Sequence, residues 1–279
     1  MAKATQVELA QVFRALHDRR KILLLPNAWD AGSARLFVQR GFAAVATTSG
    51  GLAWSLGYAD GERAPLAEVL AAVARITRVV ELPVTVDIET GYGDSPEAVA
   101  ATVQAVIGAG AVGINIEDGL PGHGPLRPLA EAAARVRAAR AAADACGVPL
   151  VINARVDNWM HADNMAPAMR LDDAIARGKA YLQAGADVIY PIGLSDPATL
   201  AALVQALDAP VNVAAGVGMP SVAELTALGV ARVSTATRLA TLALGAVDHA
   251  VRGMLISGRF DGFVSEFTYA DAQRLFAPE

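Results

Sequence analysis

The chain has 279 residues, of which 54% are hydrophobic and 18% charged, and its formal net charge is −5 at pH 7. This composition excludes intrinsic disorder, which requires low hydrophobicity and high net charge. The acidic balance argues against a nucleic-acid or anionic-membrane partner, either of which selects a basic face.

The single cysteine, Cys146, excludes an internal disulfide and any multi-cysteine zinc site, and we expect its side chain to be buried. The first twenty residues carry scattered charges and do not resemble a signal peptide. No uninterrupted apolar run approaches the roughly 18 residues that a membrane-spanning helix needs. We therefore expect a soluble, cytoplasmic protein with no membrane partner.

Short runs of β-branched and apolar residues recur along the chain and alternate with longer segments of helical periodicity. The predicted strands are residues 22–25, 43–48, 84–89, 113–118, 150–157, 186–192, 211–215 and 232–238. The clearest predicted helices are residues 65–80, 96–109, 128–146 and 170–184. Ser95 and Asp196, each followed by proline, are helix-start signals, and Ser221 and Glu224 have the spacing of a capping box.

Most of these strands are apolar throughout rather than alternating, as expected for parallel strands buried on both faces. Eight strands alternating with about eight helices predict a parallel α/β sheet with right-handed crossovers. The strand count and a length near 250 residues favour a closed (β/α)8 TIM barrel. No linker or low-complexity tract divides the chain, so we predict a single domain, residues 1–279, with helical extensions at both ends.

Acidic side chains cluster at the predicted carboxyl ends of neighbouring strands, where barrel enzymes place their chemistry. Asp87 and Glu89 are separated by one apolar residue, so a regular strand points both carboxylates to one side. Glu117, at the next strand end, adds a third acid, whereas Asp118 alternates away and is interpreted as structural. Three hard oxygen ligands predict a Mg²⁺ or Mn²⁺ site, and a set of salt bridges and helix caps is the alternative.

Other strand ends supply candidates for binding an anionic substrate. Arg155 fits a clamp for a carboxylate or oxyanion, and it fits equally an ion pair with Glu117 or Glu89. The Ser49-Gly50-Gly51 turn can expose backbone N–H groups to an anion. Two further candidates are Asn212, for substrate binding, and His123, which lies between glycines in a loop suited to a catalytic or gating role.

In their order along the chain, these motifs resemble the isocitrate lyase/phosphoenolpyruvate mutase superfamily. The resemblance extends from about Leu25 to about residue 245. The matching segments are Leu25-Pro-Asn-Ala-Trp-Asp-Ala-Gly-Ser-Ala, Ser49-Gly50-Gly51 with the following stretch through Asp60, Asp87-Ile-Glu89-Thr-Gly-Tyr-Gly, Ile116-Glu117-Asp118 and Ala154-Arg155-Val-Asp157.

The resemblance implies a Mg²⁺-dependent barrel lyase that acts on small 2-oxo or 2-hydroxy carboxylates, including dicarboxylates. It implies that Asp87 binds the metal directly and that Glu89, Glu117 and Asp60 hold it through water. The metal and Arg155 would then stabilise an enolate-like fragment while a C–C or P–C bond breaks. The candidate catalytic residues are accordingly Arg155, Glu117, Asp60 and His123. The resemblance also implies a homodimer or homotetramer that exchanges its C-terminal helix between subunits.

The chain departs from the superfamily pattern at three positions. Glu89 replaces the usual aspartate of the metal motif, and Asn115 stands where lyases often have histidine. The lyase signature Lys-[Lys/Arg]-Cys-Gly-His is absent, because the loop at residues 119–127 reads Gly-Leu-Pro-Gly-His-Gly-Pro-Leu-Arg. The lyases use that thiol as their acid/base, so this chain is not a true isocitrate lyase. Decarboxylation, hydrolysis or lyase action on a simpler 2-oxo acid fits the remaining residues.

Two other functions stay open at the level of sequence. One is a catalytically silent protein that binds 2-oxo acids after losing its acid/base loop. The other is a barrel enzyme with a phosphate-bearing ligand, suggested by Ala215-Gly216-Val-Gly218 and by Thr235–Arg238 at the last two predicted strands.

Overall fold

A computed structural model describes residues 4–122, 124–160 and 165–277, and it contains all eight predicted strands. They are β1 (Leu23–Leu25), β3 (Val45–Thr47), β4 (Val84–Asp87), β5 (Gly113–Glu117), β6 (Val151–Val156), β7 (Val188–Pro191), β8 (Asn212–Ala214) and β9 (Arg232–Ser234). A short strand, β2 (Asn27–Ala28), continues the path of β1 beyond Pro26. Every strand pairs in parallel with its neighbours, as predicted from the apolar runs.

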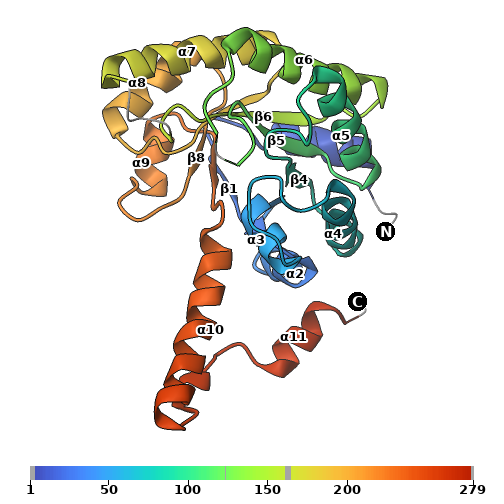
Figure 1. Cartoon of the computed structure of the whole chain (residues 1–279), viewed down its shortest axis with the longest axis vertical. Helices are drawn as coiled ribbons and strands as arrows, with labels where there is room; N and C mark the ends of the chain where they lie inside the picture. Colours follow the sequence, from blue (N-terminus) through green and yellow to red (C-terminus); the bar gives the residue numbers. More distant parts are fainter. Residues whose placement is uncertain (1–3, 123, 161–164, 278–279) are drawn as a thin grey trace.

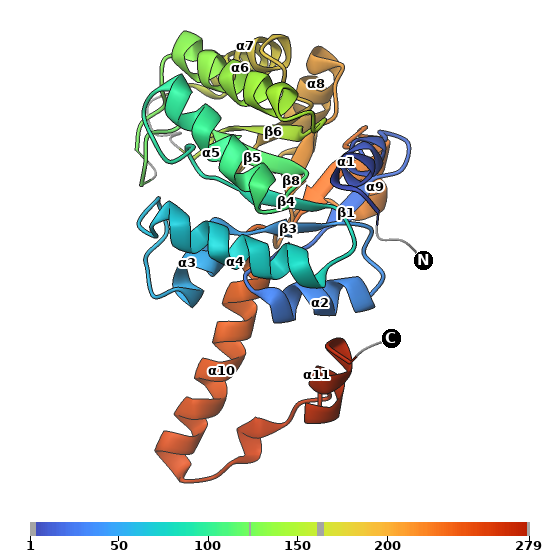
Figure 2. The same ribbon diagram turned by 90° about the vertical axis from the view of Figure 1, so that its right-hand side faces the viewer.

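The strands follow one another around a barrel. One ladder runs β2-β3-β4-β5-β6-β7 and the other β1-β9-β8. The chain itself joins the ladders where β1 continues into β2, and a parallel bridge between Ile189 and Val211 joins them on the other side. Figures 1 and 2 show the helices outside these strands. The predicted (β/α)8 architecture is confirmed.

The helices begin and end close to the predicted boundaries. Their bounds are α1 (Gln6–Ala15), α2 (Ala31–Gln39), α3 (Ser49–Ser55), α4 (Leu66–Val79), α5 (Pro96–Gly108), α6 (Leu129–Ala145), α7 (Pro167–Gln183), α8 (Pro197–Leu207), α9 (Val222–Ala227), α10 (Arg238–Ser257), the 3₁₀ turn η2 (Asp261–Phe263) and α11 (Tyr269–Leu275). Ser95 and Asp196 accept the expected capping hydrogen bonds, and Ser221 forms a capping box with Glu224. Cys146 ends α6 and is exposed, so the expectation that it is buried was wrong.

Helix α1 covers the amino-terminal end of the barrel. Phe13 is fully buried and approaches Gly113, the first residue of β5, so closely that a side chain there would collide with its ring. The His17 ring packs edge-to-face on Phe13, with centroids 4.8 Å apart, and its Nδ1 lies 2.8 Å from the Phe13 carbonyl oxygen. With this end covered, the opposite end of the barrel is the one available for a site.

The barrel interior contains a polar layer beneath that available end. Asn153 donates to Asn115 Oδ1 at 2.8 Å, and Arg232 donates to the same oxygen at 3.3 Å. Asn212 donates to Ser234 Oγ at 3.0 Å. Arg232 is completely buried, and this burial lowers its pKa to about 10. The barrel centre therefore holds a guanidinium where an all-aliphatic layer is the usual filling.

Helix α10 extends away from the barrel, and α11 returns beside α2 (Figures 1 and 2). Arg35 Nε of α2 donates to the Leu275 carbonyl oxygen at 2.6 Å, which fixes α11 against its own barrel. By length and mean hydropathy, α10 alone among the described helices is long and apolar enough to cross a membrane. The sequence analysis expected no such segment, because Asp248 and Arg252 interrupt the apolar run.

Buried His17 makes the stability of the fold depend on pH. Its pKa falls to about 3, mainly because burial disfavours the imidazolium and further because Arg232 repels it. Unfolding restores a pKa near 6.5, so the contribution of neutral His17 to stability is complete above that pH and is lost as the pH falls towards 3. The loss reaches up to about 1.4 kcal/mol per pH unit.

We predict that His17→Gln, which removes the titrating ring but keeps an amide donor for the Phe13 carbonyl, flattens the fall in unfolding free energy between pH 7 and pH 4. Urea unfolding at several pH values measures this slope. His249→Gln on the exposed face of α10 is the matched control and should keep the native slope. Equal slopes in the native protein and His17→Gln would show that His17 does not cause the acid sensitivity.

Candidate active site

A cavity of about 230 Å³ lies at the carboxyl ends of the strands. It contains four of the predicted site residues, namely Ser49, Asp60, Asp87 and Arg155. The other residues that line it are Asn27, Thr48, Asn115, Met160, Tyr190, Ile192, Ser234, Ala236 and Thr237. The rule that barrel chemistry collects at these strand ends therefore located the site.

Arg155, in β6, is held rigidly at the edge of this cavity. Its Nε and one terminal nitrogen donate to the two carboxylate oxygens of Asp157 at 2.6 and 3.0 Å. Its other terminal nitrogen lies 2.5 Å from a carboxylate oxygen of Glu117, which faces it across the β5–β6 register. Burial would lower the pKa of Arg155, but Glu117 and Asp157 outweigh burial and raise it. The guanidinium is thus a fixed, permanent positive charge.

Glu117 lies behind the cavity wall rather than on it. Only 7% of the residue is exposed, and burial raises the pKa of its carboxyl well above the ordinary value. Arg155 acts in the opposite direction, whereas Asp157 and Asp87 raise the pKa further. The ion pair between Arg155 and Glu117, which the sequence analysis offered as an alternative to substrate binding, is therefore present. Arg155 nevertheless also lines the cavity.

Asp87 and Glu89 lie close enough to repel each other, but they are not alternate residues of one regular strand. Strand β4 ends at Asp87, and Glu89 has a left-handed backbone with φ of 52°, which breaks the alternation assumed from the sequence. Glu89 accepts hydrogen bonds from the Glu62 backbone N–H at 2.6 Å and from the Tyr92 hydroxyl at 3.3 Å. Asp87 stays on the cavity wall and accepts from the Glu89 N–H at 3.1 Å.

Asp60, Asp87 and Glu89 form an acidic rim, and the pKa values of Asp87 and Glu89 are raised above their ordinary values. Burial raises the pKa of Asp87, Arg155 lowers it, and Asp60 raises it again. The pKa of Glu89 is raised to about 8, first by burial and then by repulsion from Asp87 and Asp60. Across the described ranges, no three His, Cys, Asp or Glu side chains converge on one point as a complete set of metal ligands.

The loop after β4 is held in place by a buried arginine side chain, that of Arg135. Arg135 of α6 donates to the carbonyl oxygens of Thr90, Gly93 and Asp94, at 2.8 Å in the case of Gly93. Gly91 has φ of +104°, and a side chain there would come within 2.9 Å of Val99. The glycines of this motif serve a tight turn that packs on α5, and Arg135 fixes the turn that follows Asp87.

The Ser49-Gly50-Gly51 turn forms the first turn of α3, and its residues have different roles. Ser49 lines the cavity, and its backbone N–H contributes a hydrogen bond that lowers the pKa of Asp87. Gly51 is required by packing, because a Cβ there would lie 2.7 Å from Thr48 and 2.9 Å from Trp29. A Cβ on Gly50 would approach Thr237 at 3.0 Å and Asp60 at 3.1 Å. Both glycines bring α3 close to the cavity without lining it.

Two predicted residues lie away from the cavity surface or outside the described residues. Asn212 is fully buried and reaches the site only through Ser234. His123 lies outside the described residues.

Asp118, interpreted as structural, accepts hydrogen bonds from the Tyr181 hydroxyl at 2.6 Å and from the Asp157 backbone N–H at 2.9 Å. It thereby supports Asp157, the residue that orients Arg155.

Tyr190 and Ser234 are cavity residues that the sequence analysis did not include as candidates. Tyr190, in β7, faces Arg155 across the strand register, and burial raises its pKa to about 12. Its hydroxyl therefore stays protonated at neutral pH and can donate a hydrogen bond into the cavity. Ser234 is the last residue of β9 and Tyr190 the last but one of β7, so both lie where the strand-end rule applies.

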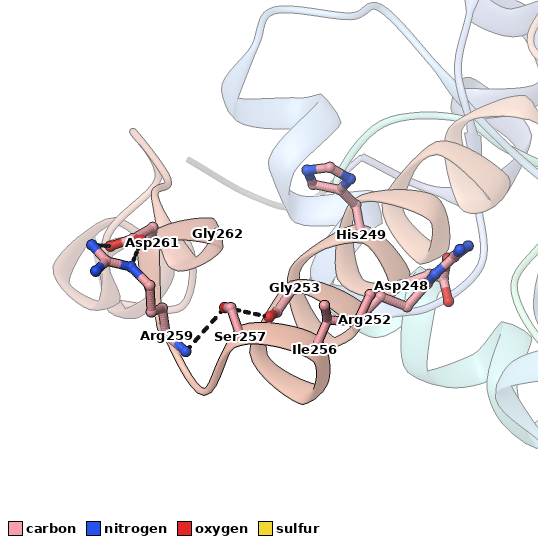
Figure 3. A pocket seen from close by; sticks show the side chains of 9 residues that line it. All are labelled: Asp248, His249, Arg252, Gly253, Ile256, Ser257, Arg259, Asp261 and Gly262. Atoms are coloured by element: carbon pink, nitrogen blue, oxygen red, sulfur yellow. Dashed lines mark hydrogen bonds and ion pairs between the residues drawn. The ribbon is translucent and has the colours of Figure 1, made fainter.

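A separate hollow lies between α10 and η2 (Figure 3). Asp248 and Arg252 pair at 3.5 Å on one of its sides, and Arg259 and Asp261 pair at 2.5 Å on the other. None of the predicted site residues lines it. The strand-end cavity is therefore the candidate active site.

Comparison with known proteins identifies similar chains. The family model described as phosphoenolpyruvate phosphomutase matches residues 13–255. The 2-methylisocitrate lyase of Escherichia coli is 35% identical over 208 residues, which cover 72% of this chain and 68% of that protein. A Burkholderia cenocepacia structure, described as a candidate lyase/mutase, is 41% identical with a TM-score of 0.90, covering 98% of this chain and 97% of that one. Phosphonopyruvate hydrolase, solved with oxalate and Mg²⁺, is 25% identical with a TM-score of 0.81, covering 96% and 94%.

Proposed function

The chain belongs to the isocitrate lyase/phosphoenolpyruvate mutase superfamily, and on that basis we propose that it is a Mg²⁺- or Mn²⁺-dependent enzyme that cleaves a C–C or P–C bond in a small 2-oxo or 2-hydroxy carboxylate. The observation that carries the proposal is the shared cavity of Asp60, Asp87 and Arg155. A carboxylate pair beside a rigid guanidinium suits an ion and an oxyanion held next to each other.

The acidic rim suits a divalent cation that keeps most of its water. Burial and, after it, repulsion between carboxylates raise the pKa of Asp87 and of Glu89, and a cation bound between them would offset both effects. Mg²⁺ is commonly bound by one or two carboxylates with water and substrate, so a complete ligand set from the protein is not required. Asp87 would bind the ion directly, and Glu89, Glu117 and Asp60 would act through water. When bound, the ion supplies Lewis-acid polarisation of the substrate's oxo or hydroxyl oxygen.

Side chains and backbone groups of the protein would bind the substrate and stabilise its developing charge. In the first turn of α3, the Gly50 and Gly51 backbone N–H groups and the Ser49 side chain would bind the substrate carboxylate. Arg155 stabilises the negative charge of the enolate-like intermediate, and its two acidic partners keep it in place before the reaction starts. Tyr190 donates a further hydrogen bond from a hydroxyl that remains protonated.

The proposal includes a homodimer or homotetramer located in the cytoplasm. The projecting helix α10 exposes apolar side chains, among them Leu242, Val247, Leu255 and Ile256. A run of exposed apolar side chains on one helix is the kind of surface that a subunit interface covers. The ion pair of Asp248 with Arg252 within α10 favours a protein partner over lipid. Exchange of this helix between subunits would bury the same surface.

We predict that Asp87→Ala abolishes Mg²⁺ binding, because Glu117 is engaged by Arg155 and Glu89 by Glu62 and Tyr92. Isothermal titration of Mg²⁺ in the presence of oxalate measures the affinity. Asp172→Ala, at an exposed position of the outer helix α7, is the matched control and should bind Mg²⁺ like the native protein. An unchanged Mg²⁺ affinity in Asp87→Ala would contradict the metal assignment.

Arg155 distinguishes an enzyme from a silent binding protein. We predict that Arg155→Lys and Arg155→Ala lower kcat by about 100–1000-fold while substrate affinity falls far less, because the guanidinium binds charge that develops in the transition state. Lysine keeps the charge but loses the planar two-pronged geometry, so it should recover little.

The assay uses oxaloacetate, phosphonopyruvate, methylisocitrate and dimethylmalate with Mg²⁺, and the Arg155 variants are measured on the best substrate. A fall in kcat/KM with kcat intact would reduce Arg155 to a substrate clamp. No turnover by the native protein on any of the four would favour the silent binding protein.

A further inference from the structure

The loop between α3 and α4, residues 56–65, brings Asp60 to the cavity and is held on two sides. On one side it packs against the loop after β5, because a Cβ at Gly61 would lie 2.8 Å from the Cα of Gly122. On the other side Glu62 bonds to the loop after β4. Asp60 is one residue from the first contact and two from the second, so its position depends on both.

Glu62 is bonded through its backbone and through its side chain. Its backbone N–H donates to Glu89 Oε2 at 2.6 Å. Its Oε1 accepts from the Thr90 hydroxyl at 2.5 Å and from the Tyr92 backbone N–H at 3.0 Å. The Tyr92 hydroxyl in turn donates to Glu89 Oε1 at 3.3 Å. Together Glu62, Glu89, Thr90 and Tyr92 form a closed set of hydrogen bonds, which we call the Glu62 clasp.

The clasp uses backbone conformations that residues with a side chain rarely adopt. Five non-glycine residues in the described part of the chain have a positive φ, and three of them are Glu62, Glu89 and Tyr92, at 60°, 52° and 55°. Left-handed backbone is unfavourable at such residues and persists only where the surrounding contacts impose it. Because conformations of this kind gather at functional sites, three of them bonded to one another indicate a functional role for the clasp.

Glu62 acts on the cavity without lining it, whereas Asp60 and Asp87 are part of its wall. Burial, and then repulsion from Asp87 and Asp60, raises the pKa of Glu89. When ionised, Asp60 and Glu89 therefore push their two loops apart. The hydrogen bond from the Glu62 backbone to Glu89 opposes this separation directly, since it joins the two loops at that point.

We propose that Glu62 is a positioning residue that holds Asp60 and Glu89 at the spacing of a hydrated divalent cation before the cation binds. The inference rests on the proposed function, because that function supplies the cation. A site arranged in advance binds more tightly than one that binding must first assemble. The hydrogen bonds of Glu62 carry this role and its charge does not, so a side chain that keeps the acceptor oxygen should keep the role.

The test is calorimetric titration of Mg²⁺, with oxalate present, into the full-length native protein, Glu62→Ala and Glu62→Gln. We expect Glu62→Ala to weaken Mg²⁺ binding by about 10–100-fold, the usual loss when a residue that orients a metal ligand is removed. Glu62→Gln should stay within about threefold of the native affinity, because its amide oxygen accepts the same two hydrogen bonds. Glu81→Ala is the matched control and should bind like the native protein, because Glu81 is exposed and precedes β4 at the opposite end of the barrel.

A second variant weakens the clasp without changing any charge. Thr90→Val keeps the shape of a fully buried side chain but removes the hydroxyl that donates to Glu62, so it should weaken Mg²⁺ binding in the same direction by a smaller factor. Urea unfolding without Mg²⁺ checks that each variant folds. Oxalate titrated at saturating Mg²⁺ should bind every variant as it binds the native protein, because Ser49 and Arg155 are untouched.

The outcomes separate this inference from the proposed function. Native-like Mg²⁺ affinity in Glu62→Ala, or in Thr90→Val if Glu62→Ala does not fold, would overturn the inference and leave the proposed function standing. Equal losses in Glu62→Ala and Glu62→Gln would assign the effect to the charge of Glu62 and overturn the inference as well. Parallel losses of Mg²⁺ binding, of oxalate binding at saturating Mg²⁺ and of stability in urea would reduce Glu62 to a support of the fold. If the native protein binds no Mg²⁺ with oxalate, the proposed function fails, and the clasp has no cation to position.

Discussion

The site depends on the burial of several carboxylates beside one guanidinium. Arg155 is engaged by Glu117 and by both oxygens of Asp157, and Asp87 and Glu89 are close enough to perturb the same group of acids. Each of these charges is costly to remove from water unless opposite charge accompanies it. The pKa values of Asp87 and Glu89 remain raised beside this arginine, first because of burial and further because of repulsion between the acids. A bound divalent cation would complete the balance, so the same interaction links fold, metal and substrate.

The rest of the barrel is arranged around that constraint. Helix α1 covers the opposite end with Phe13, and the polar layer under the cavity places the buried Arg232 below Asp87. Arg135 fixes the loop that follows Asp87, and Asp118 supports the backbone of Asp157. Arg135 and Asp118 bond to backbone atoms at the mouth of the barrel, whereas Arg232 bonds to the Asn115 side chain in its interior. Loss of any of them would loosen the orientation of the site as well as the fold.

Much of this arrangement could be predicted because it follows from local patterns. Apolar runs identified every barrel strand except the short β2, and the rule for strand ends located Asp87 and Arg155. The left-handed backbone of Glu89 was missed, because strand alternation was extended two residues beyond the end of β4. Tyr190 was missed because its position opposite Arg155 follows from the strand register and not from any local pattern. The roles of Gly51, which is packed against Trp29, and of Asn212, which lies beneath Ser234, depend on contacts between distant segments that no local pattern contains.

The central claim is that the acidic rim and Arg155 bind a 2-oxo acid together with a divalent cation. Calorimetric titration of oxalate into the native protein, once with excess Mg²⁺ and once with EDTA, tests it most directly. Both oxygens of a vicinal pair can chelate a cation held by Asp87, so the account predicts clearly tighter binding with Mg²⁺. Equal affinity in EDTA would mean that the anion site works alone, and it would contradict the account.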